Sequence, residues 1–272
     1  MVPMITQRNQ PTKMSNKINN DGLTFWDHLD ELRTCFIRIF VAVFVCGIVA
    51  FCFKDFLFKI VLAPKSPDFL TYQFFTLLGA DVESFNVQLI NTELAQQFLI
   101  HLKVAMYAGV VCVSPYIIYA LFHFISPALY SNEKKASIQA IGGGYVMFLL
   151  GVLLTYFLIF PLTFRFLGTY QVSNEVTNYI SLTSYISTLL VLCLLMGILF
   201  EIPIVCWLLA RFGFLKHDFM KHYRRHAIVA ICIIAAIITP TADAFTLGIV
   251  ALPIYLLYEF SIFIVKRTNR RS

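Results

Sequence analysis

The stretch YISTLLVLCLLMGILFEIPIVCWLLA, which runs from Tyr185 to Ala210, contains a single charged residue, Glu201. A helix needs about 20 apolar residues to cross the hydrocarbon core of a bilayer, so this stretch is long enough to span it. Four other apolar stretches also qualify: Thr34–Phe53, Phe98–Phe122, Ile138–Pro161 and Phe245–Val265. The sequence therefore predicts a polytopic helical membrane protein.

The composition agrees with this interpretation. Of the 272 residues, 59% are hydrophobic and only 13% are charged, whereas a typical soluble domain has about a quarter charged residues. The mean hydropathy of +0.76 leaves too little polar surface to cover a soluble core of this size. The composition thus disfavours a soluble enzyme, a secreted disulfide scaffold, a disordered chain and a nucleic-acid-binding module.

One further apolar run, Ala227–Thr239, is too short for an ordinary span. Its length as a helix is about 20 Å, compared with a hydrocarbon core of about 30 Å. We interpret it as a short fifth span that forms a tight hairpin with the sixth, Phe245–Val265, which gives six transmembrane helices. The alternative is a re-entrant or buried core segment.

The distribution of Lys and Arg predicts the orientation. Fifteen of the 21 lie in the N-terminal segment, in the loops after spans two and four, and in the C-terminal tail. These residues are Arg8, Lys13, Lys17, Arg33, Lys134, Lys135, Arg211, Lys216, Lys221, Arg224, Arg225, Lys266, Arg267, Arg270 and Arg271. The positive-inside rule places both termini in the cytoplasm, and the net charge of +6 then requires no nucleic-acid partner.

The chain divides into three parts. Residues 1–23 are polar, lack the apolar region of a cleaved secretory signal, and are expected to form a disordered cytoplasmic tail. Residues 24–266 form the membrane domain, and 267–272 a basic tail. The long outer segment after span one is expected to contain short amphipathic helices at Phe56–Leu62 and Glu93–Leu99, and Phe164–Ser184 is expected to be a shorter connector.

No pattern indicates catalysis or a cofactor. The seven cysteines lie in apolar runs without CxxC spacing, which predicts neither a disulfide framework nor a metal site. Walker, HExxH and GxSxG motifs are absent from the sequence. The glycines at Gly142–Gly144 are expected to permit close helix packing.

Three acids lie within or at the ends of spans. Glu201 is the deepest, and an ionised acid there must face protein, water or a partner because lipid does not solvate it. Its role is either functional or that of a structural hydrogen-bonding group. Asp243 follows Thr-Pro-Thr at the outer hairpin, and Glu259 is expected to reach the inner interface near Lys266.

Three further acids, Asp27, Glu31 and Glu133, belong to the basic cytoplasmic side. Asp27, Glu31 and Arg38 share one helix face, because their spacing is i, i+4 and i+7. That face is either simply solvated or part of a site. Glu133 is either paired with Lys134 or Lys135 or available to a ligand.

Several of these elements, taken in order, closely resemble the TatC family, the receptor subunit of the twin-arginine protein translocase. The resemblance extends from about Thr24 to Lys266, and the ordered set is much more specific than any one element. The matching elements are His28-Leu-Asp-Glu31-Leu-Arg33, Ala63-Pro64, Phe124-Ile-Ser-Pro127-Ala-Leu-Tyr130 with Glu133, Phe200-Glu201-Ile-Pro203, Arg224-Arg225, Thr239-Pro240 with Asp243, and Ala251-Leu-Pro253.

The resemblance implies an all-α, cup-shaped bundle of six transmembrane helices in which the fifth and sixth are short. It implies a bacterial plasma (inner) membrane protein that binds the twin-arginine signal peptides of folded precursors. It also implies single-span TatA- and TatB-type partners, other copies of the chain itself, and export driven by the proton-motive force. It implies neither an enzymatic activity nor a cofactor.

The resemblance also assigns roles to residues. Glu31 and Glu133 look like the carboxylates that receive the two signal arginines, and Pro64 belongs to the outer cap. The residues that flank the two carboxylates are Arg33, Phe124, Pro127, Lys134 and Lys135. Glu201 resembles the family's buried acid and Asp243 its outer-hairpin acid. The sequence departs from the family at Leu247, where a Gln is common, so the resemblance does not extend to a polar patch between spans five and six.

Rival functions belong to other classes. An ion-coupled small-solute transporter would also place Glu201 in the membrane, but it should show broken helices and internal repeats, and no repeat is visible. A membrane enzyme would need a clustered catalytic set. A structural scaffold of the same translocase would differ in making no direct contact with signal peptides.

Overall fold

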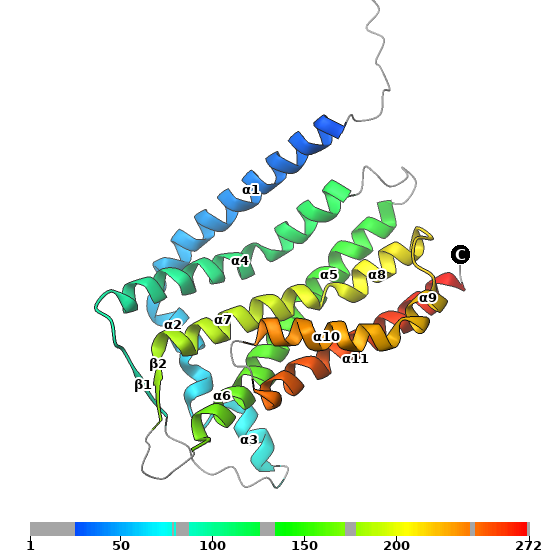
Figure 1. Cartoon of the computed structure of the whole chain (residues 1–272). Helices are drawn as coiled ribbons and strands as arrows, with labels where there is room; N and C mark the ends of the chain where they lie inside the picture. The colour runs from blue at the N-terminus through cyan, green and yellow to red at the C-terminus, as the bar shows by residue number, and fades with distance from the viewer. Residues whose placement is uncertain are drawn as a thin grey trace, which may run out of the picture.

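The structure is a computed structural model that describes residues 25–77, 79, 87–125, 134–171, 178–239 and 243–270, apart from the side chains at 25, 27, 28, 125 and 134–137. Its long helices alternate in direction along one bundle (Figure 1). In chain order they are α1 (Phe25–Phe51), α4 (Gln96–Ile125), α5 (Lys134–Leu154) with α6 (Phe160–Thr169), α7 (Leu182–Leu199) with α8 (Ile202–Arg211), α10 (Arg224–Ile238) and α11 (Ala244–Asn269).

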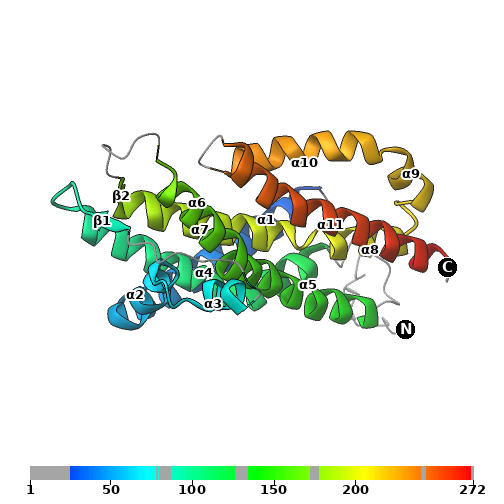
Figure 2. The same cartoon turned by 90° about the horizontal axis from the view of Figure 1, so that it is seen from below.

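The two ends of the bundle carry different structural elements. The start of α1 and the end of α11 lie at the same end, here called the termini end (Figure 2). The opposite end, here called the cap end, carries α2 (Lys54–Leu62), a single turn at Ala63–Lys65, α3 (Leu70–Leu77) and two short strands. Because the long helices alternate in direction (Figure 1), the six passes formed by the described helices named above bring the chain back to the termini end.

Among the residues that the structure describes, five helical stretches are long and apolar enough to cross a membrane. They are Leu29–Phe51, Gln96–Phe124, Ile138–Thr169, Leu182–Arg211 and Ala244–Asn269. The other pass, α10, has 15 residues, which corresponds to about 22 Å. The all-α polytopic class is therefore confirmed, and α10 is the short helix. The expectation of a short sixth helix is wrong, because α11 has 26 residues, extends beyond the expected Phe245–Val265 and is long enough to span a membrane.

Span three is longer than expected. A π-helical turn at Thr155–Ile159 joins α5 to α6, so the helix continues to Thr169. The prediction of a connector beginning at Phe164 is wrong, because Phe164 is buried in the core and the helix continues past it. The Thr71 hydroxyl of α3 donates to the Phe157 carbonyl within the π turn, which ties the cap to this helix.

Span four is interrupted at Phe200 and Glu201, between α7 and α8. Pro203 lies in the first turn of α8, where the missing N–H of proline does not matter because the first backbone donors of a helix have no intrahelical partner. Phe200 and Glu201 keep right-handed helical backbone angles, and Leu182–Arg211 remains one apolar span. The carboxylate of Glu201 projects from this short break.

Glycines allow two close helix crossings. A Cβ on Gly109 of α4 would lie 2.8 Å from the Val43 carbonyl oxygen and 2.9 Å from the Gly47 nitrogen of α1. A Cβ on Gly151 of α5 would lie 2.8 Å from the Met196 carbonyl oxygen of α7. Small residues let membrane helices pack backbone to backbone, where van der Waals contact drives association.

Tyrosine hydroxyls attach the cap to the bundle. Tyr72 of α3 lies 3.2 Å from the Pro64 carbonyl oxygen and 3.0 Å from that of Pro161. Burial raises the pKa of Tyr72, so its hydroxyl remains protonated and able to donate. Tyr185 of α7 donates to the Val61 carbonyl oxygen at 3.1 Å. The cap is thus fixed by bonds to backbone oxygens of α2, the turn that follows it, and α6.

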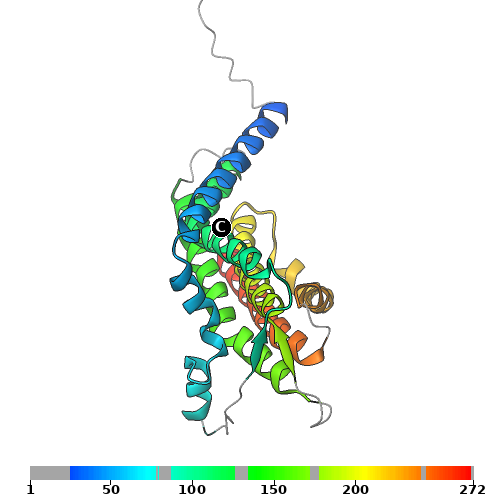
Figure 3. The same cartoon turned by 90° about the vertical axis from the view of Figure 1, so that its left-hand side faces the viewer.

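The cap also contains a two-stranded ladder that the sequence did not predict. β1 (Gln88–Ile90) pairs in parallel with β2 (Tyr179–Ser181), with Leu89 opposite Ile180 (Figure 3). The helix expected at Phe56–Leu62 lies within α2, whereas Glu93–Leu99 is not a separate helix, because α4 begins at Gln96. α3 was not predicted.

Candidate functional site

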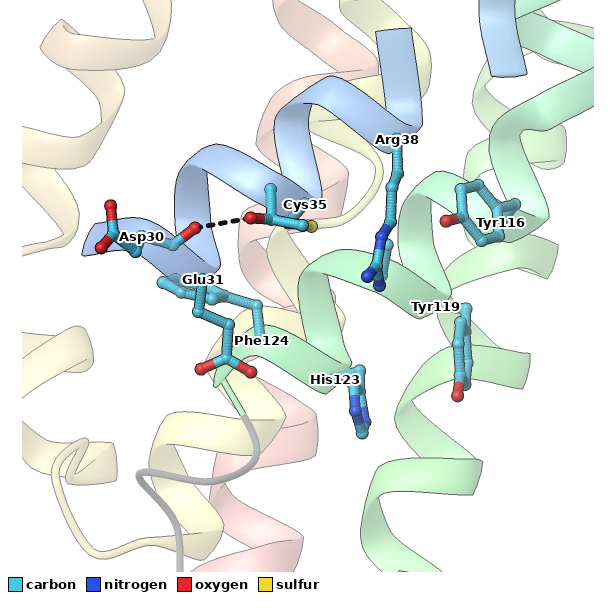
Figure 4. Close-up of a pocket in the computed structure, with 10 residues that line it drawn as sticks. Asp30, Glu31, Cys35, Arg38, Tyr116, Tyr119, His123 and Phe124 are labelled. Atoms are coloured by element: carbon cyan, nitrogen blue, oxygen red, sulfur yellow. Dashed lines mark hydrogen bonds between the residues drawn. The ribbon is translucent and has the colours of Figure 1, made fainter. Parts of the chain in front are cut away.

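A groove of about 390 Å³ lies between α1 and α4 near the termini end (Figure 4). One wall comes from α1 and the other from the last three turns of α4. The lining residues are Asp30, Glu31, Thr34, Cys35, Arg38, Tyr116, Tyr119, Ala120, His123 and Phe124. The groove therefore combines two acids, a cation and an aromatic wall.

The charged side chains of α1 that line the groove point in different directions. Glu31 is half-buried, and its carboxylate extends toward the end of α4, as does the guanidinium of Arg38 (Figure 4). The Asp30 carboxylate points away from α4 and is exposed. The expectation that Glu31 and Arg38 share one face is confirmed, because both line the groove. The side chain of Asp27 lies outside the described residues.

Local packing positions the two walls. On α1, the Thr34 hydroxyl donates to the Asp30 carbonyl oxygen at 2.8 Å, one turn earlier in the helix. On α4, the rings of Tyr119 and His123 stack with centroids 5.7 Å apart. Phe124 is half-buried at the end of this aromatic wall. Such a groove suits a ligand that has both a cationic group and an apolar or flat surface.

The other expected members of the site are distributed differently. Arg33 is exposed and does not line the groove, because it lies two positions from Glu31 and so faces another side of α1. Pro127 and Glu133 lie outside the described residues. Lys134 and Lys135 begin α5, and their side chains are likewise outside the described set.

Sequence reasoning missed the groove's arginine and most of its aromatic wall. Arg38 was assigned to the face of Glu31 but not to a site. Tyr116, Tyr119 and His123 were not singled out, although their spacing of three and four residues, continued to Phe124, indicates one helix face. That periodicity was the available signal.

Glu201 belongs to a different cluster. A Cβ on Gly144 of α5 would lie 2.9 Å from its Oε2 and 3.2 Å from Ile118 of α4. Both carboxylate oxygens are buried and form no hydrogen bond with any residue that the structure describes. A Cβ on Gly143 would lie 3.1 Å from Ile204, whereas Gly142 faces open space. The expectation that these glycines serve packing therefore holds for Gly143 and Gly144.

Asp243 and Pro64 have structural contacts. Asp243 is the N-cap of α11, and its Oδ1 accepts a hydrogen bond of 2.7 Å from the Thr246 backbone nitrogen. Leu247, one turn into α11, packs against the apolar core and so adds no polar group between α10 and α11. Pro64 is buried in the cap, where its carbonyl faces the Tyr72 hydroxyl.

Glu259 has a different partner from the one expected. Its Oε2 lies 2.5 Å from the guanidinium of Arg224, and its Oε1 accepts from the Tyr255 hydroxyl at 3.2 Å. The prediction of an interaction near Lys266 is wrong, because the start of α10 packs beside α11 at the level of Glu259. The pair joins the two helices at the termini end.

Within the described ranges, no three histidine, cysteine or acidic residues are grouped closely enough to hold a metal ion. The fold and the groove together define a polytopic helical membrane protein whose binding groove contains a half-buried carboxylate.

Comparison with known proteins identifies the family. The model of the family "Sec-independent protein translocase protein (TatC)" matches residues 27–253. A TatC of Blattabacterium sp. subsp. Periplaneta americana (strain BPLAN) is 34% identical over 92% of this chain and 97% of its own length. One from Aquifex aeolicus (strain VF5) is 35% identical over 90% and 96%. The chain therefore belongs to the Sec-independent protein translocase TatC family.

A solved structure agrees. A crystal structure described as the twin-arginine translocase receptor TatC aligns with a TM-score of 0.73 and 35% identity, covering 89% of this chain and all of the other. The chain is accordingly a subunit of the twin-arginine protein translocase. The transporter alternative is not supported by these comparisons.

Proposed function

We propose that this chain is the signal-receptor subunit of the translocase and that its groove receives the twin-arginine signal peptide of a folded precursor. The observation that carries the proposal is the half-buried carboxylate of Glu31, which extends into a groove with an aromatic wall (Figure 4). Glu133, the second acid of the matched motifs, supplies the carboxylate for the other arginine.

The chemistry of the groove favours arginine. A guanidinium forms two parallel hydrogen bonds with a carboxylate, whereas the ammonium of lysine is a point charge without that geometry. A guanidinium can also stack on the aromatic rings of the α4 wall. Arg38 shares the groove with Glu31, so a second cation must approach Glu31 from the side away from Arg38, which restricts the orientation of the ligand.

Family membership supports a wider setting for the proposed function. The chain lies in the bacterial plasma (inner) membrane with both termini in the cytoplasm, because the termini end has the higher density of Lys and Arg. TatA- and TatB-type single-span subunits and other copies of this chain bind its lipid-facing helices, and the proton-motive force drives export. The short α10 permits local thinning of the bilayer beside it.

Binding of a twin-arginine peptide to the purified full chain tests the central proposal. Hydrogen bonds to charged groups contribute roughly 1.5–3 kcal/mol each, so Glu31→Ala should weaken binding roughly ten- to a hundredfold, at 1.4 kcal/mol per decade. Glu133→Ala should do the same, and the double variant should be worse. A peptide with two lysines should bind weakly to every variant.

Asp30→Ala is the matched control, since this acid lies beside Glu31 on α1 but points away from α4. It should bind the peptide with nearly wild-type affinity. If the Glu31/Glu133 double variant binds the peptide with wild-type affinity, these acids are simply solvated and do not form the site. That result would favour a scaffold role for the chain. The measurement should be repeated at two salt concentrations, because screening weakens exposed pairs most.

The orientation is tested separately by single-cysteine labelling in a chain without the native cysteines. Cysteine at Lys221, which is exposed at the termini end, should react only when reagent reaches the cytoplasm. Cysteine at Glu93, which is exposed at the cap end, should react from outside. The reverse pattern would overturn the orientation.

A further inference from the structure

A second hollow, of about 590 Å³, lies at the termini end, between α9 (His217–His222) and the start of α10. Its lining residues are Asp218, Lys221, His222, Arg225 and His226. Both helices lie along an outer edge of the bundle (Figure 2), and none of these residues lines the groove of Glu31. The translocase function described above does not use this hollow.

The hollow lies at the expected level of lipid headgroups. Val229, one turn after Arg225, is 60% exposed, and Ile237 further along α10 is 78% exposed. Arg225 is therefore about 6 Å along the helix axis from a side chain that faces hydrocarbon. Next to the hollow, Phe219 and Tyr223 are 58% and 44% exposed, with ring centroids 4.6 Å apart. Exposed aromatic residues of this kind are typical of the membrane interface.

The charges of the hollow favour an anion. Lys221 and Arg225 are both exposed, and neither forms an ion pair with a residue in the described part of the chain. Asp218 is the single acid of the lining and also has no ion-pair partner among the described residues. His222 and His226 each carry at least one N–H donor, whatever their protonation state. Two cations against one acid leave the hollow positive.

The framework around the hollow is fixed by packing. Met220 of α9 is 5% exposed and packs in a small apolar cluster with Ala210 and Val265. Its carbonyl oxygen accepts a hydrogen bond of 2.8 Å from the Tyr258 hydroxyl of α11. The neighbouring Arg224 is engaged by Glu259, so Arg225 is the arginine that remains available at the start of α10.

We propose that this hollow binds the headgroup of an anionic glycerophospholipid. Lys221 and Arg225 bind the phosphodiester oxygens, and His222 and His226 donate hydrogen bonds to the same headgroup. Asp218 opposes the anion and so limits its affinity. The acyl chains then lie along α10 against its exposed isoleucine and valine side chains. The proposal does not depend on signal-peptide binding.

Native mass spectrometry of the purified full chain tests the proposal. Phosphatidylglycerol is titrated in detergent, and the fraction of protein that retains lipid is compared with that for phosphatidylcholine. A Lys or Arg near an anionic headgroup raises affinity roughly fivefold, so Lys221→Gln and Arg225→Gln should each reduce retention of phosphatidylglycerol by about that factor. Asp218→Asn should increase it. Retention of phosphatidylcholine should not change.

Controls separate a specific site from general effects. Lys266→Gln removes one exposed positive charge at the same end of the bundle but outside the hollow. Because Lys266 does not line the site of the bound headgroup, this variant should change retention less than about twofold. The Lys221→Arg/Arg225→Lys variant keeps both charges and should retain lipid, which distinguishes lost binding from misfolding.

Two results would overturn the proposal. Equal retention of phosphatidylglycerol by wild type and the Lys221→Gln/Arg225→Gln variant would assign the bound lipid to another surface. Displacement of the lipid by millimolar inorganic phosphate or glycerol 3-phosphate, with no preference for the acylated form, would make the hollow a site for free phosphate compounds. Retention of phosphatidylglycerol that resists both competitors supports the lipid site.

Discussion

The carboxylate of Glu201 lies directly against the backbone of Gly144, so that a methyl group on Gly144 would be 2.9 Å from Oε2. The acid projects from the break between α7 and α8 into a contact between α4, α5 and α8. Glycine at 144 leaves room for the carboxylate, and no described residue donates a hydrogen bond to it.

Substitutions at Glu201 should separate its charge from its shape. Burying an ionised, unpartnered carboxylate is costly, so Glu201→Gln should leave the melting temperature in detergent unchanged or raise it. If protonation of Glu201 takes part in export, the Gln variant should export poorly while signal-peptide affinity stays normal. Glu201→Ala, which also removes side-chain volume, is the comparison. If the Gln variant exports as well as the wild type, protonation of Glu201 is not needed for export and the role of this residue is structural.

Gly109→Ala should loosen the crossing of α1 and α4. The added methyl group would meet backbone atoms of Val43 and Gly47 within 3 Å, and backbone cannot move aside as a flexible side chain can. Overpacking of this kind typically costs about 1–3 kcal/mol, which a denaturation curve in detergent would measure. Because α1 and α4 also form the groove, peptide affinity should fall as well.

Gly142→Ala is the control for Gly109→Ala, since a Cβ on Gly142 meets nothing within 4 Å. Alanine has the better helix propensity by about 0.5–1 kcal/mol, so this variant should be as stable as the wild type or more stable. Equal destabilisation by both substitutions would contradict the close crossing.

Asp243→Ala should destabilise α11 through loss of its N-cap. The bond from the Thr246 backbone nitrogen is 2.7 Å long, and removal of a capping side chain costs about 1 kcal/mol. Asp243→Asn keeps a capping oxygen without the charge and should retain stability. If Asn destabilises as much as Ala, the negative charge rather than the cap is what matters at this position.

Tyr72→Phe should weaken the attachment of the cap. Removal of the hydroxyl takes away the donor that faces the Pro64 and Pro161 carbonyl oxygens, and an unsatisfied buried polar group costs about 1–3 kcal/mol. Limited proteolysis of the cap segment should become faster. Tyr179→Phe changes a side chain that is 59% exposed. The protease should cleave the cap of this control variant at the wild-type rate.

The long helices were predictable because a span must satisfy a simple length and hydropathy requirement, which Tyr185–Ala210 meets plainly. The break within that span was not predicted, although Pro203 was visible, because proline is tolerated in membrane helices. The pairing of Leu89 with Ile180 could not be predicted, since it joins two short segments far apart in sequence.

The groove was predictable only in part. Glu31 was identified through matched motifs, and its shared face with Arg38 through helical periodicity. The opposing wall from Tyr116 to Phe124 depends on how α4 is rotated against α1, and the glycine crossing at Gly47 and Gly109 sets that rotation. Neither glycine was singled out, because each contact needs a partner on another helix.

The bond between Tyr185 and Val61, which joins residues 124 positions apart, has a consequence for biogenesis. Synthesis proceeds from the N-terminus, so the segment that contains α2 must wait in the membrane until α7 has been made. During that interval Val61 lacks its tyrosine partner, and β1 has no strand to pair with. During membrane insertion, helices α1 to α6 therefore form an intermediate in which the cap is not yet attached to α7. Insertion of the fourth span then completes the cap.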